Sequence, residues 1–387
     1  MMNCLRSFAV SFLALLAFVP ASAQGNDSFV RRVLDRILAP SLELDPAAVY
    51  QPEPRWTIAI TGDMRQAGMS QNYYFDMAAL TPDGEGKYII EKIPTSISSR
   101  LAGGVIGGVG FQAGLGGLSV SLSKKFKGEG VNNTLSFDYM SAGYAFQLQY
   151  FKFSDLVKYD FVMGEPGSPH YQEFSGYTIN PGQMRALILD TFYAFNRRTF
   201  AYSAAYRGSV IQRRSAGSWM FGSKLILGDY GLDPSEDVAL WAGGQAEQTS
   251  AQVSFGGGYS YNFVPFHRQP YGDREKGLRN LTVNVTFLPM VTMFNQFTST
   301  EYAYTDVGVY TPSKKNVMNG NLLVNYVARA GVGYTWDLNT VNINASYDSY
   351  AYKGNATLNY ETVVSSSVKT TGDFQRWTVN LRFCRHF

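Results

Sequence analysis

Apolar and polar residues alternate along most of this chain. In residues 279–287 (RNLTVNVTF), Leu281, Val283, Val285 and Phe287 alternate with Asn or Thr. Residues 251–263 repeat the pattern over 13 positions, and the even positions of 322–336 are again mostly apolar. Because successive side chains of a strand point to opposite faces, this period predicts β-strands with one apolar face and one rich in amides and hydroxyls.

The alternating runs divide the chain into strands joined by turns, and they predict an all-β fold. We expect an antiparallel up-and-down transmembrane β-barrel of 12 to 14 strands. Bacterial barrels have an even number of strands, so thirteen runs mean that one more strand lies in 64–98 or 228–248, or that two runs form one strand. The runs are 55–63, 100–111, 117–127, 133–140, 143–153, 184–194, 199–210, 216–227, 249–263, 279–290, 321–336, 340–351 and 375–386.

The composition of the polar face favours a membrane barrel over a secreted β-sandwich. A sandwich exposes its polar face to water, where Lys and Glu are plentiful. Here that face is mostly Asn, Ser, Thr, Gln and Gly, and charged residues make up 16% of the chain, against about 25% in soluble domains. Aromatic residues reach 15% and recur at the ends of the apolar faces, as in barrel girdles. The expected mature chain has no run of 18 apolar residues, which excludes a helical membrane protein.

Closure of the barrel predicts which strands meet. In lipid every backbone N–H and C=O needs a partner, so the last run, 375–386, is expected to pair with the first, 55–63. Tight connections at 194–198 and 336–340 are expected to face the periplasm, and 228–248 fits no strand-and-turn rhythm. Long connections are expected to face outside. They are 64–99, 154–183, 297–320 and 352–374.

The N-terminal residues indicate export. Residues 1–23 have one cation, a short apolar run and a small-x-small site, which predicts a cleaved signal peptide. Residues 24–54 form a periplasmic lead-in with helical spacing of apolar residues from Phe29 to Leu38; this helix could rest on the inner leaflet, plug the lumen or merely lead in. The barrel is expected to occupy 55–387 as an integral outer-membrane protein with both termini in the periplasm.

Candidate chemistry is sparse. The three histidines of the mature chain, His170, His267 and His386, lie on no common run, so the sequence predicts no catalytic residues, no metal site and no cofactor. The formal net charge of +3 gives no reason to expect nucleic acid. The protein is therefore expected not to be an enzyme. An outer-membrane lipid hydrolase or protease is the less favoured alternative, with His170 or His267 as its base.

Four charged residues are predicted to line the lumen because their parity is opposite to that of the apolar face. Asp190, Arg207, Lys224 and Arg329 each alternate with apolar neighbours, and a charge facing lipid at mid-depth costs roughly 2–4 kcal/mol. For Arg207 this assumes that Phe200, Tyr202, Ala204 and Tyr206 of the run 199–210 face lipid. Two interpretations stay open: ion pairs that fill and rigidify the lumen, or a cationic lining that tunes the passage of anionic or polar solutes.

Residues 192–222 (FYAFNRRTFAYSAAYRGSVIQRRSAGSWMFG) carry a family resemblance. The aromatic-Asn-basic-basic turn, the pattern F-x-Y-x-A-A and the pattern Q-x-x-S-A-G-S resemble a Bacteroidota outer-membrane family, the domain of unknown function 4421. Residues 257–266 (GGYSYNFVPF) and the ending VNLRFCRHF are similar too. The resemblance implies an outer-membrane barrel over nearly the whole mature chain and brings no catalytic residues with it.

The C-terminal strand resembles the signal that the barrel assembly machinery reads. Trp377, Val379, Leu381, Phe383 and the final Phe387 form its alternating apolar face, and Arg385 departs from the pattern. Expected partners are therefore outer-membrane lipids, lipopolysaccharide and the assembly machinery. The favoured function is a narrow channel for small polar or anionic solutes. The alternatives are a structural or surface-binding barrel with a filled lumen, using Tyr-rich outer loops such as 300–310.

Overall fold

A computed structural model describes most of the chain. The described residues are 44–53, 56–83, 87–102, 105–115, 117–125, 133–231, 247–271, 276–304, 310–319, 323–359 and 365–387. The predicted signal peptide and the predicted helix at 29–38 lie outside them. Within the described residues, no helix is long and apolar enough to cross a membrane.

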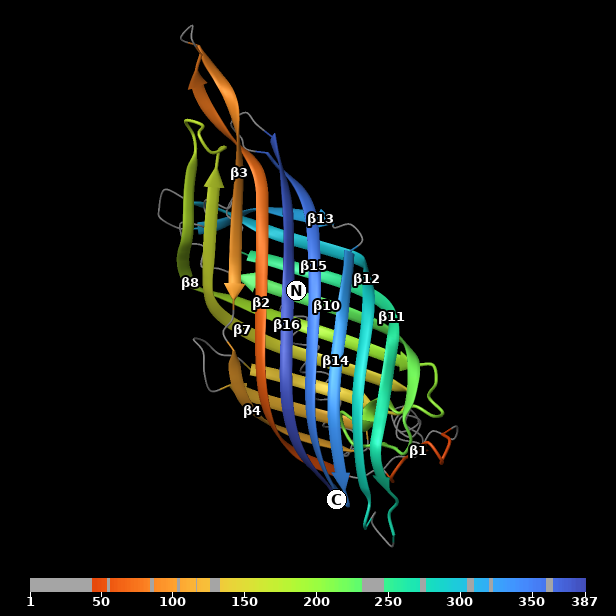
Figure 1. Cartoon of the computed structure of the whole chain (residues 1–387). Helices are drawn as coiled ribbons and strands as arrows, with labels where there is room; N and C mark the ends of the chain where they lie inside the picture. Colours follow the sequence, from red (N-terminus) through yellow and green to blue (C-terminus); the bar gives the residue numbers. More distant parts are fainter. Residues whose placement is uncertain are drawn as a thin grey trace, which may run out of the picture. The chain divides into compact units, whose positions relative to one another are not determined.

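The fold is a closed antiparallel β-barrel (Figure 1). The wall contains β2 (Trp56–Pro82), β3 (Tyr88–Ala102), β4 (Ile106–Leu115), β5 (Leu118–Lys125), β6 (Asn133–Met140), β7 (Tyr144–Met163), β8 (Gln172–Ala194), β10 (Ala216–Gly231), β11 (Glu247–Arg268), β12 (Arg279–Tyr304), β13 (Tyr310–Asn319), β14 (Leu323–Trp336), β15 (Asn339–Asn359) and β16 (Ser365–His386). The remaining described elements are β1 (Val49–Tyr50), β9 (Ile211–Gln212) and a 3₁₀ turn, η1 (Tyr202–Ala204).

The last strand seals the barrel against the first, as the sequence predicts. β16 pairs with β2 in antiparallel register, with Phe383 opposite Ile60 and Arg385 opposite Ile58. The backbone N–H of Phe387 also donates to the carbonyl of Trp56, 2.9 Å away. The ring is completed by the β11 and β12 pair.

The strand count resolves to twelve positions around the ring. β3 and β4 follow one another along β2, pairing with its residues 68–82 and 56–65. β13 and β14 follow one another along β12 in the same way. Each of these two pairs therefore fills one place in the wall, and the even number lies within the predicted range of 12 to 14.

The wall loses two strands toward its upper end, taken here as the end opposite the C-terminus in Figure 1. The β5 and β6 hairpin fills only the lower part of the wall between β4 and β7. Above it β3 pairs directly with β7, with Leu101 opposite Val157. Because barrel diameter grows with strand number, the lumen narrows at that level.

The four segments predicted as long outer loops are instead mostly continuations of the strands. β2 runs to Pro82 and returns as β3 from Tyr88, and similar hairpins join β7 to β8, β12 to β13 and β15 to β16. The prediction fails here because alternation of apolar and polar residues weakens where the outer face meets water. Tyr73 is buried inside the barrel and its neighbour Tyr74 is exposed outside, so adjacent aromatic residues hide the period.

The run 199–210, predicted as a lipid-facing strand, is not part of the wall. The described connection 195–215 between β8 and β10 turns into the barrel, and Phe200, Tyr202, Ala204 and Tyr206 are buried there. The turn predicted at 194–198 therefore leads into this inner segment rather than into the next strand. The alternating aromatic residues of this segment therefore pack against apolar side chains inside the barrel and do not face lipid. The other predicted tight turn joins β14 to β15 as expected, with Asp337 at a φ of 49°.

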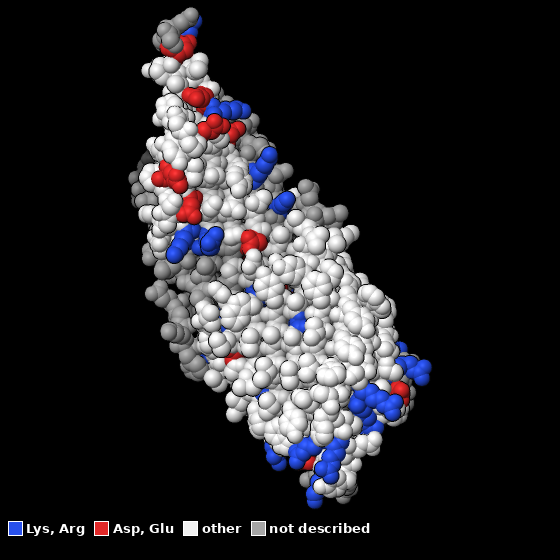
Figure 2. Space-filling model, viewed as in Figure 1, with Lys and Arg blue, Asp and Glu red and all other residues white. Residues whose placement is uncertain are grey.

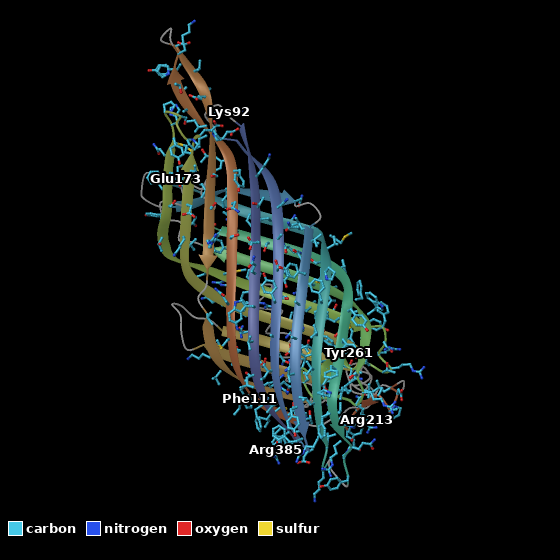
Figure 3. All side chains as sticks on the ribbon, in the orientation of Figure 1. Lys92, Phe111, Glu173, Arg213, Tyr261 and Arg385 are labelled. Carbon is cyan, nitrogen blue, oxygen red and sulfur yellow. The ribbon has the colours of Figure 1, made fainter. Side chains whose placement is uncertain are left out.

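The outer face is apolar along the middle of the wall. On β14, Val324, Tyr326, Val332 and Tyr334 point outward and are exposed, whereas the residues at the alternate positions, 325, 327, 329, 331 and 333, are buried. Figure 2 shows Lys, Arg, Asp and Glu gathered toward the two ends of the visible face, with few between. In Figure 3, Phe111 and Tyr261 lie on the lower half of the wall, Lys92 and Glu173 on the upper hairpins, and Arg385 at the lower end. This distribution is that of a transmembrane barrel.

Of the segment 228–248 that fits no rhythm in the sequence, the described ends belong to the wall. Residues 228–231 continue β10, and 247–248 begin β11. The residues between, 232–246, lie outside the described part of the chain.

Candidate functional site in the barrel lumen

The inner segment between β8 and β10, residues 199–212, lies inside the lower part of the barrel; we call it the plug. It contains η1 and β9 and ends its helical turn at Gly208, which adopts a φ of 68°. Tyr202 and Tyr206 pack against each other with ring centroids 5.1 Å apart. They join a buried cluster that includes Phe192 of β8 and Met220 of β10, so the plug is held by apolar contacts with the wall.

Inward-facing amides of the wall bind the peptide groups of the plug. Asn262 Nδ2 donates to the carbonyl of Ala201 at 2.7 Å, and Asn342 Nδ2 donates to the carbonyl of Ala205 at 2.8 Å. The Tyr206 hydroxyl lies 2.6 Å from Asn284 Oδ1. Buried peptide groups outside a sheet need such partners, which explains why the polar face of these strands is rich in Asn.

Part of the predicted lead-in, residues 44–50, lies against the plug. β1 pairs with β9, with Val49 opposite Gln212, and the N–H of Arg213 donates to the carbonyl of Ala48 at 2.7 Å. Ala48 and Val49 pack with Ala201, Ala204 and Val210 in a small apolar cluster. The plug therefore carries a second layer beneath it.

Above the plug, buried charges bridge the lumen. Lys224 Nζ of β10 lies 3.0 Å from Asp190 of β8 and 2.9 Å from Asp348 of β15. Asp190 also binds Arg329 of β14 at 3.0 Å, and Asp348 binds Arg376 of β16 at 2.7 Å. All five residues are buried, and buried charges of this kind are tolerated only when they are paired and hydrogen-bonded. We call these five residues the bridging network.

The four residues predicted to line the lumen all lie inside the barrel, but in two places. Asp190, Lys224 and Arg329 belong to the bridging network. Arg207 lies on the plug rather than on a strand, and its guanidinium pairs with Asp138 of β6 at 2.5 Å.

Sequence reasoning missed Asp348, Arg376, Arg382 and Asp138. The sequence did contain a signal for them. Trp377, Leu381 and Phe383 form an outward-facing apolar stripe, and Arg376 and Arg382 occupy positions of the opposite parity. Parity against an apolar stripe could have assigned all of them to the lumen.

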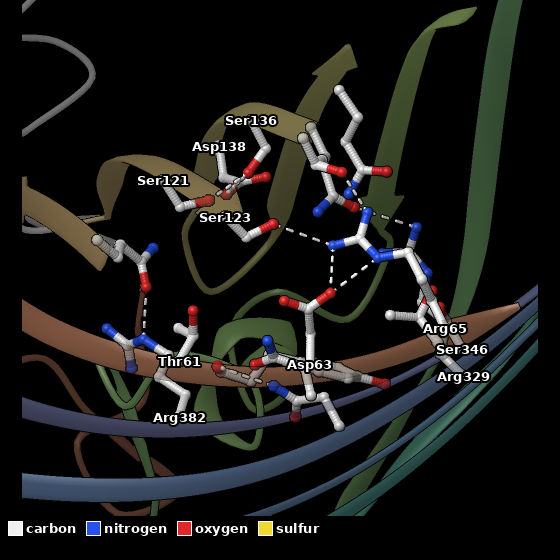
Figure 4. A pocket seen from close by; sticks show the side chains of 18 of the residues that line it. Thr61, Asp63, Arg65, Ser121, Ser123, Ser136, Asp138, Arg329, Ser346 and Arg382 are labelled. Carbon is white, nitrogen blue, oxygen red and sulfur yellow. Dashed lines mark hydrogen bonds and ion pairs between the residues drawn. The ribbon is translucent and has the colours of Figure 1, made fainter. Parts of the chain in front are cut away.

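A polar cavity lies between the plug and the wall, near the bridging network (Figure 4). Its volume is about 170 Å³. Five arginines contribute to its lining, together with two aspartates and many hydroxyls and amides. The arginines are Arg65, Arg207, Arg329, Arg376 and Arg382, and the aspartates are Asp63 and Asp138.

An apolar layer fills the lumen above the bridging network. Tyr350 stacks on Phe374, and Phe374 stacks on Phe151, with ring centroids 5.9 and 6.2 Å apart. Ile188 and Ile226 are buried in the same cluster. Still higher, Gln71, Tyr73 and Gln248 hydrogen-bond one another from β2 and β11. The lumen is thus filled at successive levels by side chains from opposite walls.

The histidines do not form a recognisable catalytic arrangement. His170 Nε2 lies 3.4 Å from Glu91 Oε2, and both side chains are partly exposed to solvent. His267 Nδ1 is 3.0 Å from Asn280 Oδ1, and His386 Nε2 is 3.3 Å from the hydroxyl of Thr340. Among the described residues, no group of three His, Cys, Asp or Glu side chains is placed to hold a metal ion.

A family model described as a domain of unknown function (DUF4421) matches residues 107–371. A search among curated proteins finds no match.

Solved structures with some similarity are also outer-membrane barrels. They include the outer-membrane protease OmpT of Escherichia coli, at 9% identity and a TM-score of 0.30 over 86% of this chain and 97% of that one. A FadL homologue of Pseudomonas aeruginosa has 10% identity and a TM-score of 0.19 over 86% and 90% of the two chains. The toluene transporter TodX of P. putida has 8% identity and a TM-score of 0.16 over 84% and 90%.

Proposed function

Because the chain belongs to the family of the domain of unknown function 4421, its function has to be inferred from the barrel itself. We propose that it is a non-enzymatic protein of the bacterial outer membrane, closed to solutes in its resting state, that acts through its protruding upper rim. The observation that supports this proposal is that the plug, the bridging network and the apolar layer each join side chains from facing strands across the barrel interior.

The wall itself supports the membrane location. Its outward side chains are apolar at mid-height and charged toward the ends, and a closed sheet leaves no backbone group unpaired in lipid. Short turns and the C-terminus share the lower end. In bacterial barrels short turns face the periplasm, so we assign the lower end to the periplasm and the upper hairpins to the cell exterior.

The strands are longer than a membrane requires, which supports a role for the rim. β2 has 27 residues, or about 90 Å at roughly 3.3 Å per residue. The apolar band of such barrels is about 25 Å tall. Even with a strand tilt of about 40°, much of β2 extends beyond lipid. The upper hairpin exposes Leu80, Tyr88 and Ile89, and exposed apolar and aromatic residues are common at binding surfaces.

Planar-bilayer recording of the purified full-length protein tests closure. We expect insertion without stable conductance steps at moderate voltage. A positive control replaces 199–212 by a Gly/Ser linker of equal length and adds Lys224→Ala, Asp348→Ala, Tyr350→Ala and Phe374→Ala. These changes remove the plug, the Lys224–Asp348 crossing and the aromatic stack, so this variant is expected to conduct. Stable conductance of the unmodified protein would overturn the proposal.

A narrow channel for small polar or anionic solutes is the second candidate, and the polar cavity favours it. In that case the plug has to move aside during transport, because it lies inside the barrel. This movement breaks the hydrogen bonds that Asn262 and Asn342 donate to its carbonyls. Solute-dependent hydrogen exchange in 199–212 would support the channel. Unchanged exchange in the presence of a panel of anions would leave the closed barrel as the better account.

Photo-crosslinking on intact cells tests the rim. A photoreactive residue at Tyr88, on the upper hairpin, is expected to capture an outer-membrane or external partner. The same probe at Val285, which faces outward at mid-wall, is expected to capture only lipid. Identical products from both positions would count against a surface role.

A further inference from the structure

The charges around the polar cavity do not balance. The described charged residues that line the cavity or belong to the bridging network comprise six cations and four carboxylates, an excess of two positive charges. The cations are Arg65, Arg207, Lys224, Arg329, Arg376 and Arg382, and the carboxylates are Asp63, Asp138, Asp190 and Asp348. Uncompensated charge inside a protein is costly, so this excess favours an anion.

Arg382 is the cation whose contacts contain no carboxylate. Its Nε donates to Gln112 Oε1 at 2.6 Å, and its Nη1 donates to Asn342 Oδ1 and to the carbonyl of Arg207, each at 3.1 Å. Only 4% of Arg382 is exposed. Its three acceptors are neutral, so its charge is solvated by dipoles and not cancelled.

Two buried donors in the cavity lining lack a partner. Gln112 Nε2 and Arg329 Nε make no hydrogen bond. Both residues are buried, with only 1% of Gln112 and 8% of Arg329 exposed, so water at the surface does not satisfy them. Unsatisfied buried donors are rare in folded proteins. Both side chains line the cavity, so an acceptor placed within it could bind them.

Three buried acceptors in the same lining also lack partners, namely Asp63 Oδ1, Asp138 Oδ1 and Asn344 Oδ1. Asp63 and Asp138 each bind an arginine through Oδ2, and their Oδ1 atoms make no hydrogen bond. A carboxylate oxygen accepts only from a donor. The ligand that suits this lining therefore carries negative charge and at least one hydroxyl.

We propose that the cavity binds a small protonated oxyanion of the phosphate class. The oxyanion oxygens accept from Arg382, Arg329 and Gln112, and its hydroxyl donates to Asp63 or Asp138. A volume of about 170 Å³ far exceeds the roughly 10–15 Å³ that one water needs, which leaves room for such an ion. Hydrogen phosphate has the required charge and hydroxyl, whereas sulfate at neutral pH has no hydroxyl to donate.

This site goes beyond the proposed function, because a closed barrel does not need a bound anion. If phosphate does not bind, the phosphate site is refuted but the closed barrel is not. If the barrel conducts, the closed barrel is refuted but the phosphate site is not.

Calorimetry on the full-length protein in detergent tests the site with inorganic phosphate as the probe. We expect saturable binding of phosphate at neutral pH and at least tenfold weaker binding of sulfate. Gln112→Glu places a carboxylate next to Arg382 and supplies the missing counter-charge. This variant is expected to fold at least as well as the parent and to bind phosphate at least tenfold more weakly.

Gln375→Glu is the matched control. Gln375 is exposed on the outer face of β16, so this substitution adds the same charge outside the lumen. Its phosphate affinity is expected to equal that of the parent. Phosphorus NMR of the unmodified protein gives a second measurement that needs no variant, with a bound signal that rises to a limit as phosphate is added and that excess sulfate does not displace. The proposal is overturned if the parent shows no phosphate binding, if sulfate binds equally well, or if both Gln→Glu variants weaken binding alike.

Discussion

Lys224 on β10 and Asp348 on β15 meet inside the barrel, with 2.9 Å between Nζ and Oδ1. The two strands are not neighbours in the wall, so the contact crosses the lumen. Arg329 and Arg376 join the same group, and the bridging network contains three cations and two carboxylates.

Asp348→Asn is expected to destabilise the barrel strongly, because it leaves three buried cations facing one carboxylate. Removing one partner of a buried ion pair typically costs roughly 3–5 kcal/mol. Adding Lys224→Met restores the original excess of one positive charge, so the double variant is expected to recover part of the loss. The readout is the temperature at which the folded, fast-migrating band disappears on gel electrophoresis. Glu173→Gln on the upper rim is the control, and an equal effect there would refute the prediction.

Gly333→Val is expected to dislodge the plug. A Cβ at Gly333 would stand 2.9 Å from the carbonyl of Ala205 and 2.8 Å from Asn342 Nδ2, so the plug backbone has to shift. Hydrogen exchange in 199–212 is expected to rise while exchange in the wall strands stays low. Gly257→Ala is the control, because its Cβ would meet only ordinary contact at 3.6 Å. Unchanged hydrogen exchange in 199–212 of Gly333→Val would refute this prediction.

Val285→Arg is expected to reduce folding into lipid, whereas Leu80→Arg is not. Both residues are exposed, by 60% and 70%, but Val285 lies on the apolar mid-wall and Leu80 on the upper hairpin. An arginine in the lipid-facing band costs roughly 2–4 kcal/mol at mid-depth and close to nothing in water. Folding yield in vesicles measures the difference, and equal yields would mean that the band has been placed at the wrong height.

Deletion of Phe387 is expected to lower insertion into the outer membrane. Phe387 is exposed at the end of β16, in line with Phe383 and Leu381, and its N–H closes onto β2. Phe387→Tyr keeps an aromatic terminus and is expected to insert normally. The amount of heat-modifiable barrel in membrane fractions is the measurement. Equal amounts for the deletion and the parent would remove the assembly role of the last residue.

Period-two alternation carried most of the fold in the lower wall. It placed strands, their outward faces and the pairing of the first strand with the last, because lipid outside and polar groups inside impose opposite chemistry on alternate residues. It also pointed Asp190, Lys224 and Arg329 inward. It could not tell that Phe200, Tyr202 and Tyr206 face an apolar interior instead of lipid, since both media select the same side chains.

The contacts that fill the lumen were beyond reach of the sequence for a geometric reason. Lys224 and Asp348 are 124 positions apart, and no local pattern links them. Their meeting depends on barrel circumference, strand tilt and register together. The Asn-rich inner faces were visible in the sequence, but their role depends on a plug that the alternation had assigned to the wall.

The plug precedes β10 to β16 in the chain, so half of the wall is synthesised after it. Arg382, which holds the carbonyl of Arg207, lies on β16, the strand that seals against β2. The pairing that closes the barrel therefore also holds the plug. Closure of the barrel and attachment of the plug are consequently coupled through one strand, so a change that loosens the pairing of β16 with β2 is also expected to loosen the plug.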